Sequence, residues 1–298
     1  MPTGSASRTA VVMCQSRAAA DGRSAVGRFA DPVAAHLLSD DERVPVDQVR
    51  AGQRPQGWAT RVAFESVRAT MQMIVPRTVA IDDAVRDQAA PQVVVLGAGL
   101  DSRAWRMAEL AGVDVFEVDR PPSQADKRAR VGGLSAVARS VRFVAVDFAA
   151  PGDVGLADAL AEAGHQAGMA TTWIWEGVIP YLSPTAVAAT LDAISVRSAA
   201  GSRLIASYQA TSVRTRIGWV TSRSWGEPWR SLWRPEQLEG LLHRYGLDVV
   251  TDESLLTVAE QIGTSVQNRR SLRDSRVVVA GRPGRRQPVP SDPQQDLP

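Results

Sequence analysis

The chain has 298 residues, a formal net charge of +2 and an apolar share of 44%. That length is enough for one large domain with a sizeable core. The small net charge gives no electrostatic footprint for nucleic acid, and no apolar run reaches the ~20 residues of a membrane span. Cys14 is the only cysteine, which excludes an internal disulfide and a multi-cysteine metal site. With no signal peptide at its start, the chain is expected to be soluble and cytoplasmic, without a metal.

The first third of the chain has the pattern of helices and no strand before residue 92. The predicted helices cover residues 10–38, with a break at 29–32, and then 60–74 and 78–89. Residues 1–9 are small and polar and are expected to be disordered. Residues 41–56 hold two prolines and one glycine, with Gly57 directly after them, and are expected to form a loop. Residues 10–89 are therefore predicted to form a helical N-terminal cap.

Strands and helices alternate from residue 90 to residue 281. Short β-branched runs are typical of buried parallel strands. The predicted strands are 92–96, 113–118, 141–146, 171–175, 202–207, 247–251 and 277–280. This order predicts an α/β fold with a doubly wound, mostly parallel seven-stranded sheet. Residues 282–298, rich in proline and polar side chains, are expected to be a disordered tail.

A glycine-rich turn follows the first predicted strand at Gly97-Ala98-Gly99. Such a turn lets a ligand approach the backbone closely. The third glycine of the dinucleotide fingerprint is absent, because Ser102 stands in its place. The turn alone therefore leaves a nucleotide site and a plain tight turn equally open, and it argues against an NAD-dependent oxidoreductase.

Acidic residues end the next three predicted strands. Asp119 lies about twenty residues after Gly97, where a carboxylate can accept from both hydroxyls of a ribose. Asp147 can accept from an adenine amine while Phe148 packs on the base, and Glu176 ends the fourth strand. Because open α/β sheets bind ligands at the carboxyl ends of their strands, we predict a nucleoside site there.

Several short segments, taken in their order along the chain, resemble the leucine carboxyl methyltransferase family. This family includes actinobacterial polyketide carboxyl O-methyltransferases and mycobacterial relatives. The matching segments are 16–18, 29–32, 77–82, 96–106, 117–119, 146–148 and 175–182. The string from Gly97 to Arg106 is the most specific to the family. The chain departs from it at Ser102, usually threonine, at Trp105, usually tyrosine, and at Phe148, usually leucine.

The resemblance implies a Rossmann-like class I methyltransferase fold. It also implies methyl transfer with S-adenosylmethionine (SAM) as cofactor and S-adenosylhomocysteine (SAH) as product. Carried over by position, the implied cofactor-binding residues are Arg17, Arg77, Gly97, Gly99, Asp119, Asp147, Phe148 and Glu176. Among them, Arg77 is implied to bind the SAM carboxylate and Glu176 to face its amine. The alternative for Arg77 is a surface ion pair with Asp82 or Asp83, and for Arg17 a ligand role and a structural role are equally open.

The acceptor is less well specified than the cofactor. A carboxylate is ionised at neutral pH and needs no general base, whereas a phenol or alcohol does. The histidines, His36, His165 and His243, all lie outside the motifs, which favours a carboxylate. No catalytic residue is assigned. Arg103 and Tyr181 are candidates for orienting the acceptor, and pairing of Arg103 and Arg106 with Asp101 or Glu109 is an equal alternative.

An insertion at 208–234 carries half of the eight tryptophans. Its aromatic and basic residues are Trp219, Trp225, Trp229, Trp233, Arg214, Arg216, Arg223 and Arg230. We expect a lid over a flat, anionic acceptor. A packed hairpin or a homodimer contact is the alternative.

Taken together, the sequence predicts an O-methyltransferase of secondary metabolism whose partner is a small-molecule acid such as a polyketide. Methylation of a peptide or protein C-terminal carboxylate is one alternative. A non-catalytic SAM-binding protein is another.

Overall fold

A computed structural model of the chain describes residues 7–88, 90–148, 155–212 and 229–284. Their centre is a seven-stranded sheet with the order β3-β2-β1-β4-β5-β7-β6. The strands are β1 Gln92–Leu96, β2 Asp114–Asp119, β3 Ser140–Ala145, β4 Thr171–Trp175, β5 Arg203–Gln209, β6 Asp248–Ser254 and β7 Ser275–Gly281. Only β7 runs antiparallel to its neighbours in this sheet. The predicted fold class is confirmed, and the strand bounds differ from the predicted ones by a few residues.

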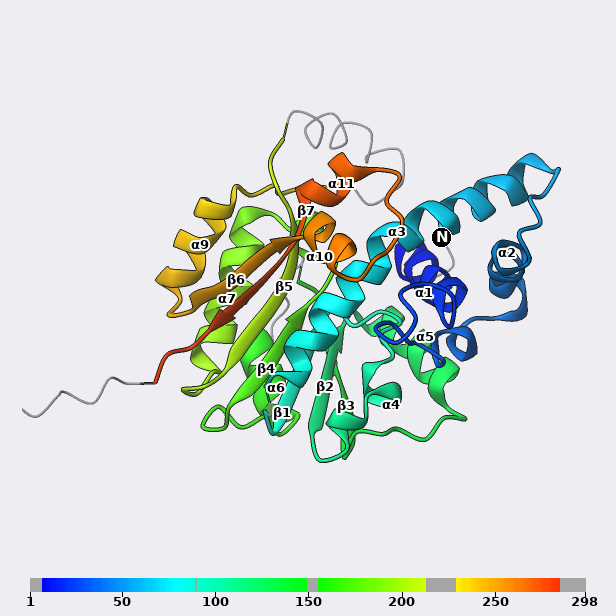
Figure 1. Ribbon diagram of the computed structural model, residues 1–298. Helices are drawn as coiled ribbons and strands as arrows, with labels where there is room; N and C mark the ends of the chain where they lie inside the picture. Colours follow the sequence, from blue (N-terminus) through cyan, green and yellow to red (C-terminus); the bar gives the residue numbers. More distant parts are fainter. Residues whose placement is uncertain (1–6, 89, 149–154, 213–228, 285–298) are drawn as a thin grey trace, which may run out of the picture.

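Helices cover both faces of the sheet because successive strand residues point to opposite sides. In β1, Val93 and Val95 pack with α1 and α3, whereas Val94 and Leu96 pack with α6, α7 and α9. The longer helices are α1 Arg8–Ala20, α2 Asp40–Ala51, α3 Trp58–Arg86, α5 Pro121–Val131, α6 Leu156–Glu162, α7 Pro184–Val196, α9 Pro235–Arg244, α10 Leu255–Gln261 and α11 Arg269–Asp274. The result is a three-layered α/β/α arrangement (Figure 1).

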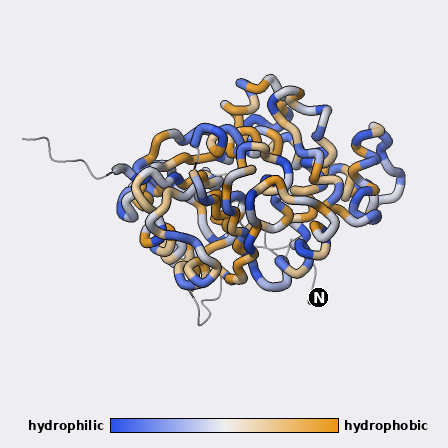
Figure 2. The backbone as a smooth tube through the Cα atoms, turned by 90° about the horizontal axis from the view of Figure 1, so that it is seen from below, coloured by the Kyte–Doolittle hydropathy of each residue, from blue (hydrophilic) through white to orange (hydrophobic). Residues whose placement is uncertain are grey.

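Apolar segments run through the middle of the molecule and hydrophilic ones gather at its edge (Figure 2). The strand residues of β1 and β4 are all buried, as their unbroken apolar or β-branched runs predict. No helix among the described residues has the length and apolar content needed to cross a membrane.

The segment at 41–56 differs from the expected loop, because α2 occupies its first part. Ser39 accepts a hydrogen bond from the backbone N–H of Glu42, and the Glu42 carboxylate accepts one from the N–H of Ser39. Gly52 ends the helix in the left-handed conformation, with φ of 67°. These two caps outweigh Pro45, whose ring lies inside the helix. The prediction of a loop there was wrong.

The two helices expected on either side of Pro76 are one continuous helix, α3. Proline removes only one helical hydrogen bond. The residues around it, from Ile74 to Val79, are all buried, so packing on both sides of the proline holds the helix together. Figure 1 shows α3 crossing the sheet and then running out beside α1 and α2.

Three other boundaries also differ from the sequence prediction. The first helix already begins at Arg8, so Arg8 and Thr9 are helical rather than disordered, and it ends at Ala20. Leu100, Ala104, Met107 and Ala108 have the spacing of one helix face, but the helix after the glycine turn is only the short α4, Arg103–Arg106, followed by a 3-10 turn at Ala108–Leu110. Asp101 accepts the backbone N–H of Arg103 and so holds the start of this segment outside the helix. Residues 1–6, 285–298 and most of the predicted lid lie outside the described residues.

A buried ion pair lies below the glycine turn. Lys127, the only lysine, donates to Glu117 at 2.6 Å and to the carbonyl of Asp101 at 2.7 Å. The other Glu117 oxygen, Oε2, has no hydrogen-bond partner in the described structure. Burial raises the pKa of Glu117 to about 7, and Lys127 offsets only part of that rise.

The substitution Glu117→Gln tests this titration. Because the folded pKa of Glu117 lies above its unfolded value, its contribution to stability is present at low pH and is lost as pH rises through about 7. Between about pH 5 and about pH 8 the wild-type free energy of unfolding should fall about 2 kcal/mol more than that of E117Q. Urea denaturation at both pH values measures the difference, and equal changes in the two proteins would contradict the raised pKa.

Candidate active site

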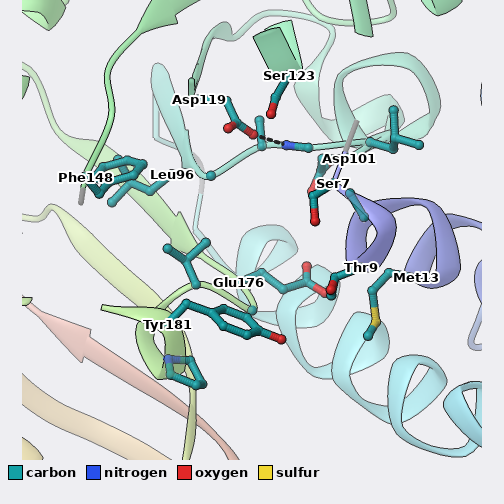
Figure 3. Close-up of a pocket in the computed structure, with 18 of the residues that line it drawn as sticks. Ser7, Thr9, Met13, Leu96, Asp101, Asp119, Ser123, Phe148, Glu176 and Tyr181 are labelled. Atoms are coloured by element: carbon teal, nitrogen blue, oxygen red, sulfur yellow. Dashed lines mark hydrogen bonds between the residues drawn. The ribbon is translucent and has the colours of Figure 1, made fainter. Parts of the chain in front are cut away.

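A cavity of about 500 Å³ opens at the carboxyl ends of β1, β2, β4 and β5. All eight residues that the sequence analysis assigned to cofactor binding line it, from Arg17 of α1 to Glu176 after β4, together with Tyr181. Figure 3 shows Asp119 and Ser123 on one side of the cavity and Tyr181 on the other. The fold therefore brings together side chains that lie far apart in the sequence.

The glycine turn has a conformation that other residues rarely adopt. Gly97 has φ of 67° and Gly99 φ of 46°. The backbone N–H groups of Gly97 and Ala98 both donate to the carbonyl of Val118, which ties the turn to β2. A Cβ atom on Gly97 would lie 2.3 Å from a methyl carbon of Val178, and one on Gly99 would lie 3.2 Å from Ala10. Only glycine fits at Gly97, and the start of α1 packs directly on the turn.

Asp119 is oriented by backbone groups before any ligand contacts it. One carboxylate oxygen accepts from the N–H of Gly99 at 2.6 Å and the other from the N–H of Arg120 at 2.7 Å. An ionised carboxylate has about four acceptor positions, so capacity for further hydrogen bonds is left. Asp147 and Phe148 follow β3 and also line the cavity.

Arg77, which is buried, and Glu176, which is half-buried, form an ion pair at the floor of the cavity. Arg77 Nε donates to Glu176 at 2.8 Å, and a terminal nitrogen contacts the Met13 sulfur at 3.5 Å. A thioether is a weak acceptor, so the terminal nitrogens of Arg77 keep donor capacity beside the cavity. Arg77 is 9% exposed and pairs with neither Asp82 nor Asp83 in the described structure.

A family model described as leucine carboxyl methyltransferase matches residues 10–195. This match covers more than half of the chain. The chain belongs to this family. The predicted resemblance is thereby confirmed, and the predicted enzyme class and cofactor agree with it.

Curated relatives of this leucine carboxyl methyltransferase family member are named as candidate SAM-dependent methyltransferases. One from Mycobacterium marinum is 46% identical over 114 residues, 38% of this chain and 36% of the relative. Another, from Mycobacterium avium, is 35% identical over 185 residues, 61% of this chain and 54% of the relative. The chain thus spans about a third to a half of the length of these relatives.

Among solved structures, one described as a candidate methyltransferase from Thermobifida fusca has the same fold. Its TM-score is 0.54 at 16% identity, covering 90% of this chain and 94% of that one. At this identity the likeness concerns the fold alone.

Arg103 lies beneath the cavity rather than in it. Its guanidinium donates to Asp82 at 2.7 Å, to Glu176 at 2.9 Å and to Asp101, and the residue is 3% exposed. These contacts favour the alternative in which Arg103 fixes the turn, and they leave Tyr181 as the acceptor-orienting candidate that lines the cavity. Arg106 pairs with Asp82 at 2.7 Å instead of Glu109, which pairs with Arg86.

Arg103 belongs to a larger buried network of alternating charges. Its members are Arg17, Arg77, Arg103 and Arg106 with Asp31, Asp82, Asp101 and Glu176. Burial alone would raise the pKa of Glu176, but Arg103 and Arg77 outweigh it and hold that pKa below its usual value. Glu176 is therefore a carboxylate at neutral pH, with one oxygen on each arginine.

Several residues that line the cavity were not among the predicted site residues. Two of them are Met13 of α1 and Met73 of α3. Each stands four residues before an arginine of the cavity, Arg17 or Arg77, and so lies on the same helix face. That spacing was the signal available in the sequence. The three histidines do not line the cavity, and the described residues hold no group of three metal-ligating side chains.

The variant Arg103→Gln tests the structural role of this arginine. It leaves Asp82, Asp101 and Glu176 short of one buried cation, so the free energy of unfolding should fall by about 3–5 kcal/mol. The control is Arg86→Gln, which removes an arginine with 39% side-chain exposure and two acidic partners. It should cost less than about 1 kcal/mol. Urea denaturation measures the free energy of unfolding of both variants. Equally small losses in the two would contradict the structural role of Arg103.

Proposed function

We propose that this chain is a SAM-dependent O-methyltransferase that methylates a carboxylate of a small molecule. Family membership supports the reaction class. The observation that carries the proposal is the single cavity that collects all eight expected cofactor residues at the ends of the strands. Ligands bind at this edge in open α/β sheets.

The residues of the cavity fit SAM chemically. The glycine turn lets a ligand approach the backbone, and Asp119 is already aimed by two backbone N–H groups. Arg77 offers donors for a carboxylate, and Glu176 offers acceptors for an ammonium group. In this proposal Asp119 holds the ribose, Asp147 and Phe148 hold the adenine, and Arg17 lies near the methionine part.

When bound, SAM supplies a methyl group on a sulfonium, and the S–CH₃ bond breaks as the acceptor oxygen forms the O–CH₃ bond. The protein's own work is to align the two groups and exclude water. No histidine lines the cavity, and a carboxylate oxygen attacks without giving up a proton. The residues present therefore support an acid as acceptor better than a phenol or an alcohol.

The size of the cavity supports a small acceptor. About 500 Å³ lies within the roughly 300–1,000 Å³ typical of small-molecule sites, and the proposed cofactor takes part of that volume. Met13 of α1 and Met73 of α3 lie on the wall that the cap provides. Both residues give the acceptor an apolar and adaptable environment.

The variant Asp119→Ala tests the cofactor site. Loss of the two ribose acceptors should weaken SAH binding at least about 100-fold, as expected for two hydrogen bonds to a charged group. The control is Asp114→Asn, at the opposite end of the same strand, where the carboxylate pairs with Arg139. Isothermal titration with SAH should give wild-type affinity for this control, and unchanged affinity in D119A would overturn the assignment.

The reaction itself is tested with methyl-labelled SAM and a panel of aromatic and alkyl carboxylic acids beside matched phenols. Base treatment hydrolyses a methyl ester and releases labelled methanol, whereas a methyl ether is stable. We expect the label that is transferred to the carboxylic acids to be released by base. Transfer to phenols only would contradict the carboxylate assignment.

A further inference from the structure

The wall opposite Asp119 is formed by the turn after β4 and by the segment 229–233. Pro180, Tyr181, Gln209, Trp229 and Arg230 line the cavity here. Figure 3 places Tyr181 on this side, across from Asp119 and Ser123. If the proposed function holds, the cofactor occupies the Asp119 side and the acceptor meets this wall.

Backbone hydrogen bonds fix the segment 229–233 in place. The N–H of Arg230 donates to the carbonyl of Pro180 at 2.6 Å, and the Ser231 hydroxyl donates to the carbonyl of Ile179 at 2.9 Å. The N–H of Trp233 donates to the carbonyl of Gln209 at 3.2 Å. Arg230 is therefore held at the rim by both the turn after β4 and the end of β5.

Arg230 differs in charge pairing from the arginines of the cavity floor. Arg17 and Arg77 each have a carboxylate partner, whereas no carboxylate of the described chain pairs with the exposed Arg230. Arg120 is also exposed and lines the cavity, but it follows Asp119 on the cofactor side. Among the residues that the structure describes, the acceptor wall thus presents one cation without an acidic partner.

Apolar and aromatic side chains also line the cavity. They include Met13, Met73, Tyr181 and the half-buried Trp229. Thioether side chains adapt to ligands of different shape, and aromatic rings bury large apolar area. A ligand that reaches from Glu176 to Arg230 therefore needs an apolar body.

The next inference rests on the proposed function. We propose that Arg230 binds a second anionic group of the acceptor, remote from the carboxylate that is methylated. The acceptor class is then an apolar molecule with two acidic groups. The reacting carboxylate must lie at the methyl group, inside the cavity, whereas Arg230 is exposed at the rim. Methylation also neutralises the reacting carboxylate, while a group on Arg230 keeps its charge.

The test is a titration of SAH-saturated protein with decanedioate and with decanoate, two acids of equal chain length. We expect decanedioate to bind about tenfold more tightly, the contribution of one hydrogen-bonded charge pair. Arg230→Ala should abolish that preference without changing the affinity for decanoate or for SAH. Arg230→Lys should retain part of it. Arg244→Ala, an exposed arginine on α9 outside the cavity, is the matched control and should behave as wild type.

The outcomes separate the two proposals. If SAH does not bind, the proposed function fails. If SAH binds but the two acids bind equally, or neither binds, the role of Arg230 is refuted while the cofactor assignment stands. The role of Arg230 is also refuted if R230A still prefers decanedioate, or if R230A loses as much affinity for decanoate as for decanedioate.

Discussion

The carboxylate of Glu176 is the point where three parts of the fold meet. It follows β4, and its two oxygens accept from Arg77 of α3 and from Arg103 of α4. Taking charges out of water costs several kcal/mol each, and only close pairing offsets that cost. The network around Glu176 satisfies the condition, because four arginines face four carboxylates. The long helix α3, the glycine turn and the sheet are thereby held in one relative position.

This constraint also determines which charges remain for a ligand. Arg103 donates to carboxylates beneath the cavity. The terminal nitrogens of Arg77 lie beside the cavity, and among the described residues a thioether is their one hydrogen-bond partner. Asp119 is aimed by backbone N–H groups and keeps acceptor capacity. A zwitterionic amino-acid group fits such a balanced floor, since it adds one charge of each sign. Ligand binding should then stabilise the cap together with the sheet, because α1 and α3 both line the cavity.

Features set by local sequence were predictable, and features set by distant partners were not. β1 and β4 follow from apolar and β-branched runs that are buried on both faces. Asp119 and Glu176 follow from their place at strand ends. By contrast, Arg103 pairs with residues 21 and 73 positions away, and no periodicity specifies such pairs. In α2 the caps at Ser39 and Gly52 outweighed Pro45, and in α3 burial outweighed Pro76. Both prolines indicated breaks, which the caps override in α2 and tertiary packing overrides in α3.

The central claim is that the cavity at the strand ends is a SAM site rather than a dinucleotide site. The most direct test is isothermal titration of the purified chain with SAM, SAH and NAD under identical conditions. We expect SAM and SAH each to bind at one site per chain and NAD to give no signal. Binding of NAD alone would contradict it, because the glycine turn and Asp119 would then serve a different cofactor.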